Sequence, residues 1–311
     1  MPVDALMTQP HYGAHWQHVW EQLPDKGVWC TSPAELPARS DLILVASFGD
    51  LRAARPHGPC VYAEHGAGMS YSNNHPSYAG ASDRKGVVLF LSPNRFAADR
   101  NSRAHPGIPQ TIVGCPRLDP MWGRRRKPRG KRPLVVFSWH WNCMIAPEAR
   151  WAWPWYKNTV GQWSDWAGRD GWQVAGHAHP KARTVINSVY RRWGIPIIDD
   201  FDEVLKRADL YVSDVSSTLW EFAATRRPVL TLNAPWYRRR VNHGLRFWEA
   251  IPGLQCWRPE SLREAVAMAL EDAAPVRAVR EKAVAEVYPV HDGTGRAVEA
   301  ITEAVGELQW V

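Results

Sequence analysis

The sequence contains no apolar run near the roughly 20 residues that a helix needs to span a bilayer. Its first residues, Met1 to Asp4, lack the basic and apolar regions of a signal peptide, so we expect a cytoplasmic protein. Cysteine is scarce, and the residues are scattered, odd in number and without CxxC spacing: Cys30, Cys60, Cys115, Cys143 and Cys256. This pattern argues against a disulfide framework or a cysteine zinc site and predicts reduced core thiols.

Acidic residues are outnumbered, 31 against 38 lysines and arginines, which gives a formal charge of +7. An anionic partner is therefore expected, and a nucleotide, nucleic acid, an anionic lipid and a phosphate polymer all qualify. Tryptophan is abundant instead: the chain has 18, and eight of them fall between Trp139 and Trp172. Most should fill the core. In the segment Trp151–Tyr156 (WAWPWY), alternation beside proline cannot bury every ring on one helical face, so we expect some rings to line a cleft.

Short β-rich runs alternate with helical stretches, which predicts an α/β protein with parallel sheets and crossover helices. A stretch without apolar residues, GRRRKPRGKR at 123–132, is the predicted linker. We therefore expect a Rossmann-like N-terminal domain at 1–122, a Rossmann-like C-terminal domain at 133–290 and a closing helix at 291–311. The expected strands are 41–46, 60–63, 86–91, 110–113, 134–138, 172–175, 195–198, 210–213 and 228–232.

The most informative segment follows the predicted strand 210–213. Ser216, Ser217 and Thr218 stand where a helix is expected to begin, and free N–H groups and the dipole at a helix N-terminus bind phosphate oxygens. Glu221 follows on the first turns, where its carboxylate can accept hydrogen bonds from both hydroxyls of a ribose. The alternative is a simple helix cap, which needs only one of these hydroxyls.

This segment resembles the donor-site signature of CDP-glycerol glycerophosphotransferases and related GT-B glycosyltransferases. Three further motifs match in order: Glu64–Gly68 (EHGAG), Val113–Asp119 (VGCPRLD) and His177–Pro180 (HAHP). The resemblance spans roughly residues 60 to 300 and includes Asp292-Gly293 before the last helix. It implies a GT-B fold, with two Rossmann-like doubly wound domains facing a central cleft and the donor in the C-terminal one.

Carried over to this sequence, the resemblance implies that His65 is the catalytic base and that His179, Ser216, Ser217 and Thr218 bind the donor phosphates. It also implies that Glu221 binds the ribose. Two departures affect the acceptor or the transferred group: Ala67 replaces the family's threonine, and SWHW at 138–141 replaces its Ala-Pro-Thr segment. The candidate cleft or acceptor residues are Arg117, Asp119, Trp139, His140 and Trp141.

No metal and no cofactor are expected, because helix dipole and side chains replace the cation in enzymes of this kind. The donor would be a UDP- or CDP-linked co-substrate. The one DxD-like piece, Asp200-Phe201-Asp202, is predicted to cap a helix. His11, His15 and His18 have helix-compatible spacing, but no cysteine or carboxylate ligand is evident beside them.

Three functions remain open. The first is a sugar transferase acting on hydroxymethylated bases in DNA, with duplex contacts from Arg124–Arg126, Lys131, Arg132, Arg238, Arg239 and Arg240; its support is the basic balance and the tryptophan cluster. The second, slightly less favoured, is a glycerophosphotransferase or surface-polysaccharide transferase of teichoic-acid type. The third is a nucleotide-sugar epimerase-like enzyme or a non-catalytic nucleotide-binding module, against which His65 counts.

Overall fold

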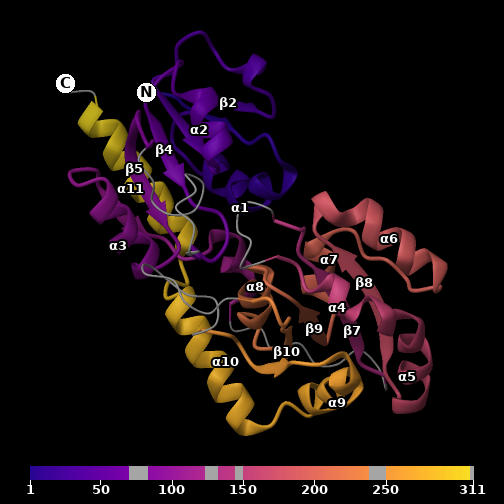
Figure 1. Cartoon of the computed structure of the whole chain (residues 1–311). Helices are drawn as coiled ribbons and strands as arrows, with labels where there is room; N and C mark the ends of the chain where they lie inside the picture. The colour runs from indigo at the N-terminus through magenta and orange to yellow at the C-terminus, as the bar shows by residue number, and fades with distance from the viewer. Residues whose placement is uncertain (70–82, 123–131, 144–149, 238–249, 309–311) are drawn as a thin grey trace. The chain divides into compact units, whose positions relative to one another are not determined.

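A computed structural model describes residues 1–69, 83–122, 132–143, 150–237 and 250–308 (Figure 1). The chain divides into two compact units. The first contains the described residues of Met1–Pro120 and Val287–Val311, and the second those of Met121–Arg240 and Phe247–Glu286. The chain thus returns to its first unit for the last helix. None of the helices in the described ranges combines the length and apolar character needed to cross a bilayer.

The first unit is built on a parallel sheet with the strand order β2-β1-β3-β4-β5-β6. Its strands are β1 (Val3–Leu6), β2 (Lys26–Cys30), β3 (Leu42–Val45), β4 (Cys60–Ala63), β5 (Val87–Ser92) and β6 (Gln110–Ile112). Its helices are α1 (Pro10–Glu21), α2 (Phe48–Ala54), α3 (Arg95–Ala104) and α11 (Gly293–Leu308). The strands β1, β3 and β4 are buried along their whole length, as expected for a parallel sheet covered on both faces.

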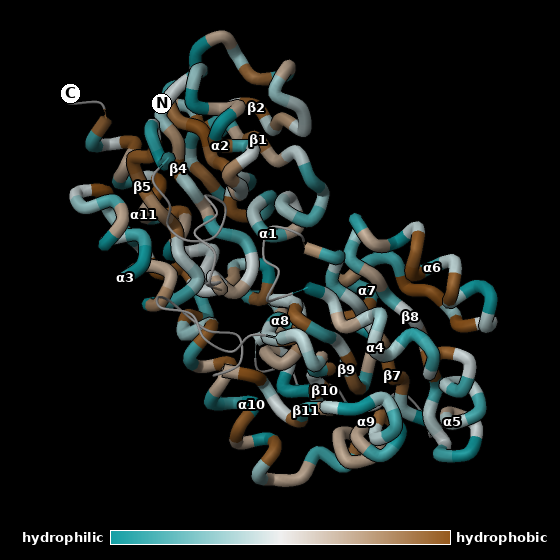
Figure 2. Tube along the Cα trace, viewed as in Figure 1, coloured by the Kyte–Doolittle hydropathy of each residue, from teal (hydrophilic) through white to brown (hydrophobic). Residues whose placement is uncertain are grey.

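Two apolar clusters fill the two faces of this sheet. In one, Trp16 and Val19 of α1 and Ile301 of α11 pack on Leu44 and Val61. In the other, Leu51 and Ala54 of α2 pack on Ile43, Val45 and Cys60. Alternate residues of β3 therefore point to opposite faces, as the pleat of a strand requires. Figure 2 shows hydrophobic segments along the strands and mixed colours along the helices.

The second unit contains another parallel sheet, with the order β11-β10-β9-β7-β8. Its strands are β7 (Leu134–Trp139), β8 (Gln173–Ala178), β9 (Leu210–Ser213), β10 (Val229–Leu232) and β11 (Leu254–Cys256). Its helices are α4 (Trp153–Tyr156), α5 (Trp163–Asp170), α6 (Arg183–Arg192), α7 (Phe201–Arg207), α8 (Thr218–Ala223), α9 (Leu262–Glu271) and α10 (Ala274–Val287). Helices α4, α5, α6 and α9 share one large core with the sheet. On β9, Tyr211 contacts Phe201 of α7 and Phe222 of α8.

The predicted α/β class and the two Rossmann-like sheets are confirmed. One predicted strand is wrong: residues 195–198 form only an isolated bridge, between Ile197 and Gly176. The strands β1, β2 and β11 and the helices α1, α2, α3 and α10 were not predicted. The run that forms β2 (KGVWC) is partly exposed and short, and β1 (VDAL) is short and contains an aspartate, so neither gives a strong apolar signal. Asp200 accepts a hydrogen bond from the N–H of Asp202 and caps α7, as predicted.

Most tryptophans fill cores, as expected. Trp139, Trp153, Trp163 and Trp172 are all buried in the second unit's core. Trp155, in the WAWPWY segment, is instead 38% exposed and lines a pocket, which confirms that not every ring of that segment is buried. All five cysteines are buried.

Candidate functional site

The carboxyl end of β9 carries the predicted phosphate-binding hydroxyls. Ser216, Ser217 and Thr218 are half-buried, and α8 begins at Thr218. The Thr218 hydroxyl lies 2.7 Å from the Ser216 hydroxyl and 2.8 Å from the Tyr211 hydroxyl. Ser217 is the N-cap residue, but its backbone is helical and its side chain makes no cap hydrogen bond. The Ser216 hydroxyl accepts a hydrogen bond from the N–H of Thr218 at 3.3 Å, as a cap would, and Ser216, Thr218 and Tyr211 form a connected group of donors and acceptors.

Glu221 lies in the first turn of α8, as predicted, and its side chain is only 2% exposed. Its charge contributes to the raised pKa of Tyr211, whose main cause is burial. A ribose would have to reach a carboxylate that is nearly covered by protein. The ribose-binding role of Glu221 therefore stays a proposal.

Asp214, directly before the hydroxyl run, organises the segment that follows β7. Its two carboxylate oxygens accept hydrogen bonds from the backbone N–H groups of His140 and Ala152, each at 2.8 Å. Burial raises the pKa of Asp214 to about 6, although these two N–H groups favour its ionised form. The sequence reading did not assign Asp214 a role; its place at a strand end, before three hydroxyl residues, was the available signal.

His179 lies at the carboxyl end of β8, in a group of aromatic and basic side chains. Its ring centroid is 5.2 Å from that of His140 and 6.2 Å from that of Trp141. Its Nδ1 accepts a hydrogen bond from the backbone N–H of Lys181 at 3.2 Å. In the neutral ring the proton is then on Nε2, which becomes a donor suited to a phosphate oxygen.

Lys181 adds a cation that the sequence reading missed. Its Nζ lies 4.6 Å from the centroid of the Trp141 ring, a cation–π contact. Burial lowers the pKa of His140 to about 4, and the charge of Lys181 lowers it further, although the hydrogen bond to the Trp141 carbonyl opposes this. His140 is therefore neutral near pH 7. Its position in the sequence, two residues after a histidine at a predicted strand end, could have indicated Lys181 as a site residue.

Asp214 joins the two motifs of this unit. Asp214 accepts a hydrogen bond from the backbone N–H of His140, and the ring of His140 contacts the ring of His179. The motif after β9 and the motif after β8 therefore lie at one edge of the sheet. This is the carboxyl edge, where open parallel α/β sheets bind ligands. Trp139 does not take part: it is 1% exposed and packs on Trp153 and Tyr156, so its interpretation as an acceptor contact is wrong.

In the first unit, His65 follows β4 and is exposed. Its Nδ1 lies 2.6 Å from the carbonyl oxygen of Ala46, and its ring centroid lies 4.4 Å from that of Tyr12. The carboxylate of the neighbouring Glu64 accepts hydrogen bonds from Arg100 and Asn101. Burial alone would raise the pKa of Glu64, but these two residues lower it.

Two of the other candidates have structural contacts. Both carboxylate oxygens of Asp119 cap α11: they accept from the N–H groups of Gly293 and Thr294, at 3.1 and 2.7 Å, and from the Thr294 hydroxyl, at 2.6 Å. Arg132 donates to the carbonyls of Ala167 and Trp172 at the end of α5, a role that the DNA interpretation did not foresee. Arg117 is half-buried.

The remaining basic candidates lie outside the described residues: Arg124–Arg126, Lys131, Arg238, Arg239 and Arg240. Nothing in the structure therefore bears on the duplex contacts expected of them. Within the described ranges, no group of three histidine, cysteine, aspartate or glutamate side chains could hold a metal ion.

Comparison with known proteins agrees with the motif reading. The sequence model of the family "CDP-Glycerol:Poly(glycerophosphate) glycerophosphotransferase" matches residues 169–306, from α5 into α11. Over this segment the chain is similar to CDP-glycerol glycerophosphotransferases. No curated protein matched the sequence.

Solved structures support the fold of this glycerophosphotransferase-like chain. The wall teichoic acid polymerase TagF aligns with a TM-score of 0.66 at 12% identity, over 98% of this chain and 89% of that one. MnaA of S. aureus with UDP aligns with a TM-score of 0.62 at 14% identity, over 98% and 97%. A putative UDP-N-acetylglucosamine 2-epimerase from Listeria monocytogenes gives the same TM-score, identity and coverage. The GT-B fold class predicted from the motifs is confirmed.

Proposed function

We propose that the protein is a transferase of teichoic-acid type that moves glycerol phosphate, or a related group, from a CDP-linked donor to a hydroxyl of a polymeric acceptor. One observation carries the proposal: the hydroxyl run at the start of α8 and His179 share one sheet edge through Asp214 and His140. This edge lies mostly in the segment that matches the glycerophosphotransferase family.

The donor phosphates would be bound by hydrogen-bond donors on this edge. Ser216 and Thr218 offer hydroxyls, and Nε2–H of His179 offers a third donor. Lys181 is close enough to this group to add positive charge. Together they would neutralise the negative charge that collects on the departing nucleotide as the bond to it breaks.

His65 in the first unit would accept the proton of the acceptor hydroxyl. The acceptor oxygen would form a bond to the β-phosphorus of CDP-glycerol as the bond from that phosphorus to the bridging oxygen breaks. CMP would leave with the electron pair, and the hydroxyl proton would go to Nε2 of His65. With a nucleotide sugar the same base would serve attack on the anomeric carbon, with the nucleoside diphosphate as the leaving group.

Transfer of teichoic-acid type is better supported than transfer of sugar to DNA, which the basic charge and the tryptophan cluster slightly favour. The family match and the likeness to TagF point to it, and Arg132 has carbonyl partners within its own unit. The epimerase alternative has support at the level of the fold only, from MnaA and the Listeria protein. Independence from metal stays a prediction.

The decisive test is a transfer assay with several donors and acceptors. Labelled CDP-glycerol, UDP-glucose and UDP-N-acetylglucosamine would each be incubated with a glycerol phosphate primer, hydroxymethylated DNA and unmodified DNA, with and without EDTA. We expect label on the primer only, from CDP-glycerol, with no loss in EDTA. Label on hydroxymethylated DNA alone would refute the proposal, and interconversion of UDP-sugars without transfer would establish the epimerase alternative.

A further inference from the structure

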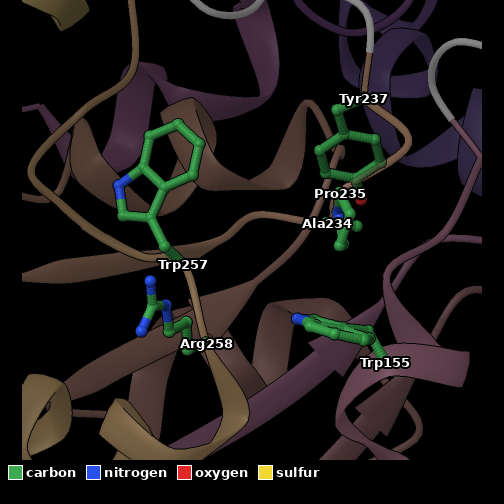
Figure 3. Close-up of a pocket in the computed structure, with 6 residues that line it drawn as sticks. All are labelled: Trp155, Ala234, Pro235, Tyr237, Trp257 and Arg258. Carbon is green, nitrogen blue, oxygen red and sulfur yellow. The ribbon is translucent and has the colours of Figure 1, made fainter.

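A pocket of about 500 Å³ lies at the carboxyl ends of β10 and β11 in the second unit. Figure 3 shows the rings of Trp155, Tyr237 and Trp257 around it, with Arg258 on the side of Trp257. Trp155 and Trp257 are 38% and 48% exposed, and Trp236, whose centroid is 6.4 Å from that of Trp155, is 38% exposed. Three of the eight exposed large apolar side chains of the described residues thus gather here. Single exposed apolar residues are ordinary on a protein surface, but three tryptophans in one place indicate a binding site.

The elements that carry these rings are fixed to one another by a single carbonyl group. The carbonyl oxygen of Cys256, at the end of β11, accepts a hydrogen bond from the Tyr156 hydroxyl and another from the backbone N–H of Asn233, each at 2.8 Å. Tyr156 is the neighbour of Trp155, and Asn233 begins the segment that leads to Tyr237. Trp257 follows Cys256 directly. The backbone segments that carry the three rings are therefore joined before any ligand arrives, which lowers the entropy cost of binding.

Trp155 faces the pocket because the two aromatic side chains nearest to it in α4 are buried. Trp153 and Tyr156 are 4% and 0% exposed and belong to the core. In the short helix α4, burying these two rings leaves the ring between them on the outer face.

The chemistry of the lining selects the kind of ligand. Aromatic faces stack on flat or weakly polar ring surfaces, and the C–H face of a saccharide ring is such a surface. Arg258 and the indole N–H groups are donors without acceptor capacity, which suits the hydroxyl oxygens at the rim of a saccharide.

We propose that this pocket binds a saccharide ring. The ring belongs to the acceptor, or to the transferred group if the donor is a nucleotide sugar rather than CDP-glycerol. The pocket is near enough to the donor edge for both, because β9, β10 and β11 are adjacent and neighbouring strands lie about 4.8 Å apart. The proposal deepens the proposed function. Only the assignment of the ring to the donor rests on that function.

The test measures saccharide binding in the full-length protein and four variants. Trp155→Ala and Trp257→Ala remove one ring each, Trp155→Phe keeps an aromatic face, and Trp193→Ala is the matched control. Trp193 is 49% exposed in the same unit, at the end of α6, and does not line the pocket. Binding would be measured on an array of immobilised hexose and N-acetylhexosamine oligosaccharides, and by calorimetry with CDP-glycerol, UDP, UDP-glucose and UDP-N-acetylglucosamine.

We expect each of the two alanine variants of the pocket to lose about tenfold or more in saccharide affinity, in line with losses on removing a stacked aromatic ring. Trp155→Phe and Trp193→Ala should stay within about twofold of the wild type. A loss on UDP-sugars but not on UDP would assign the ring to the donor. A loss on the array alone would assign it to the acceptor.

Two results would overturn the proposal. If the pocket variants weaken UDP and UDP-sugars equally, the nucleobase occupies the pocket. If the wild type binds neither array saccharides nor UDP-sugars more tightly than UDP, there is no saccharide site. Failure of the proposed function looks different: no label would pass from CDP-glycerol to the glycerol phosphate primer, while saccharide binding to the array could persist.

Discussion

The Nδ1 atom of His65 lies 2.6 Å from the carbonyl oxygen of Ala46. A carbonyl oxygen can only accept a hydrogen bond, so Nδ1 of His65 carries a proton. In the neutral ring, Nε2 is then left with its lone pair. Ala46 follows β3 and His65 follows the adjacent strand β4, so the pairing of two parallel strands determines the protonation of this side chain. That tautomer is the one a general base needs.

His65→Ala should lower the transfer rate by about 10² to 10⁴-fold, the usual contribution of a general base. Nucleotide affinity should be nearly unchanged, because the donor residues lie in the other unit. Steady-state kinetics and calorimetry would measure the two quantities. His57→Ala is the matched control, since the Nδ1 of His57 also lies 2.7 Å from a carbonyl, that of Pro37, but away from the proposed site. Equal loss of rate in both variants would remove His65 from catalysis.

The hydroxyls of Ser216 and Thr218, at the start of α8, should bind the donor phosphates. Thr218→Val keeps the shape of the side chain and removes its hydroxyl, and Ser216→Ala removes the neighbouring one. Each should weaken nucleotide binding by about 1 kcal/mol or more, because hydrogen bonds to charged groups are worth about 1.5–3 kcal/mol. Calorimetry with CDP and CDP-glycerol would test this. Ser188→Ala, which alters an exposed hydroxyl on α6, should have no effect. Unchanged affinity in both site variants would exclude a phosphate site there.

Asp214 should make stability depend on pH. Its pKa is about 6 in the folded protein and near 4 when unfolded, so the folded state binds the proton more tightly. The contribution of this group to the free energy of unfolding is therefore greatest below about pH 4 and falls as pH rises to about 6, by up to about 3 kcal/mol. Urea unfolding of the wild type and of Asp214→Asn between pH 4 and 7 would measure it.

The difference in the free energy of unfolding between these two proteins should fall across that range. A constant difference would contradict the raised pKa. Asparagine can accept from only one of the two N–H groups, so Asp214→Asn should also weaken nucleotide binding by loosening the segment at His140.

Asp119 should matter for stability rather than for transfer. Asp119→Ala removes the three hydrogen bonds that Asp119 accepts from the start of α11 and should destabilise the protein by about 1–2 kcal/mol, the range of lost helix caps. Asp119→Asn should lose less. Thermal unfolding would measure both variants, with the transfer rate at a permissive temperature as the second readout. A rate that falls strongly while stability is unchanged would restore Asp119 as an acceptor residue.

Much of the fold could be predicted from the sequence. Mostly apolar runs such as Cys60–Ala63 and Leu210–Ser213 form strands within the predicted bounds, because a strand buried on both faces consists mainly of apolar residues. Ile195–Ile198 looks similar but lies beside β8 and forms a single bridge. β2 was missed because it is partly exposed, with an alternating rather than continuous pattern of burial. A local pattern reports burial, and pairing depends on neighbours elsewhere in the chain.

The sequence by itself determined the α/β class, the two sheets and the order of the motifs, because strand burial and helix starts depend on adjacent residues. Only the tertiary structure decided what the side chains do. It buried Trp139 while it exposed Trp155, and it used Asp119 to cap a helix some 170 residues later in the chain. It also placed Asp214 against two N–H groups far away in sequence. Such contacts depend on which strands become neighbours, and the residues that meet carry no local sign of one another.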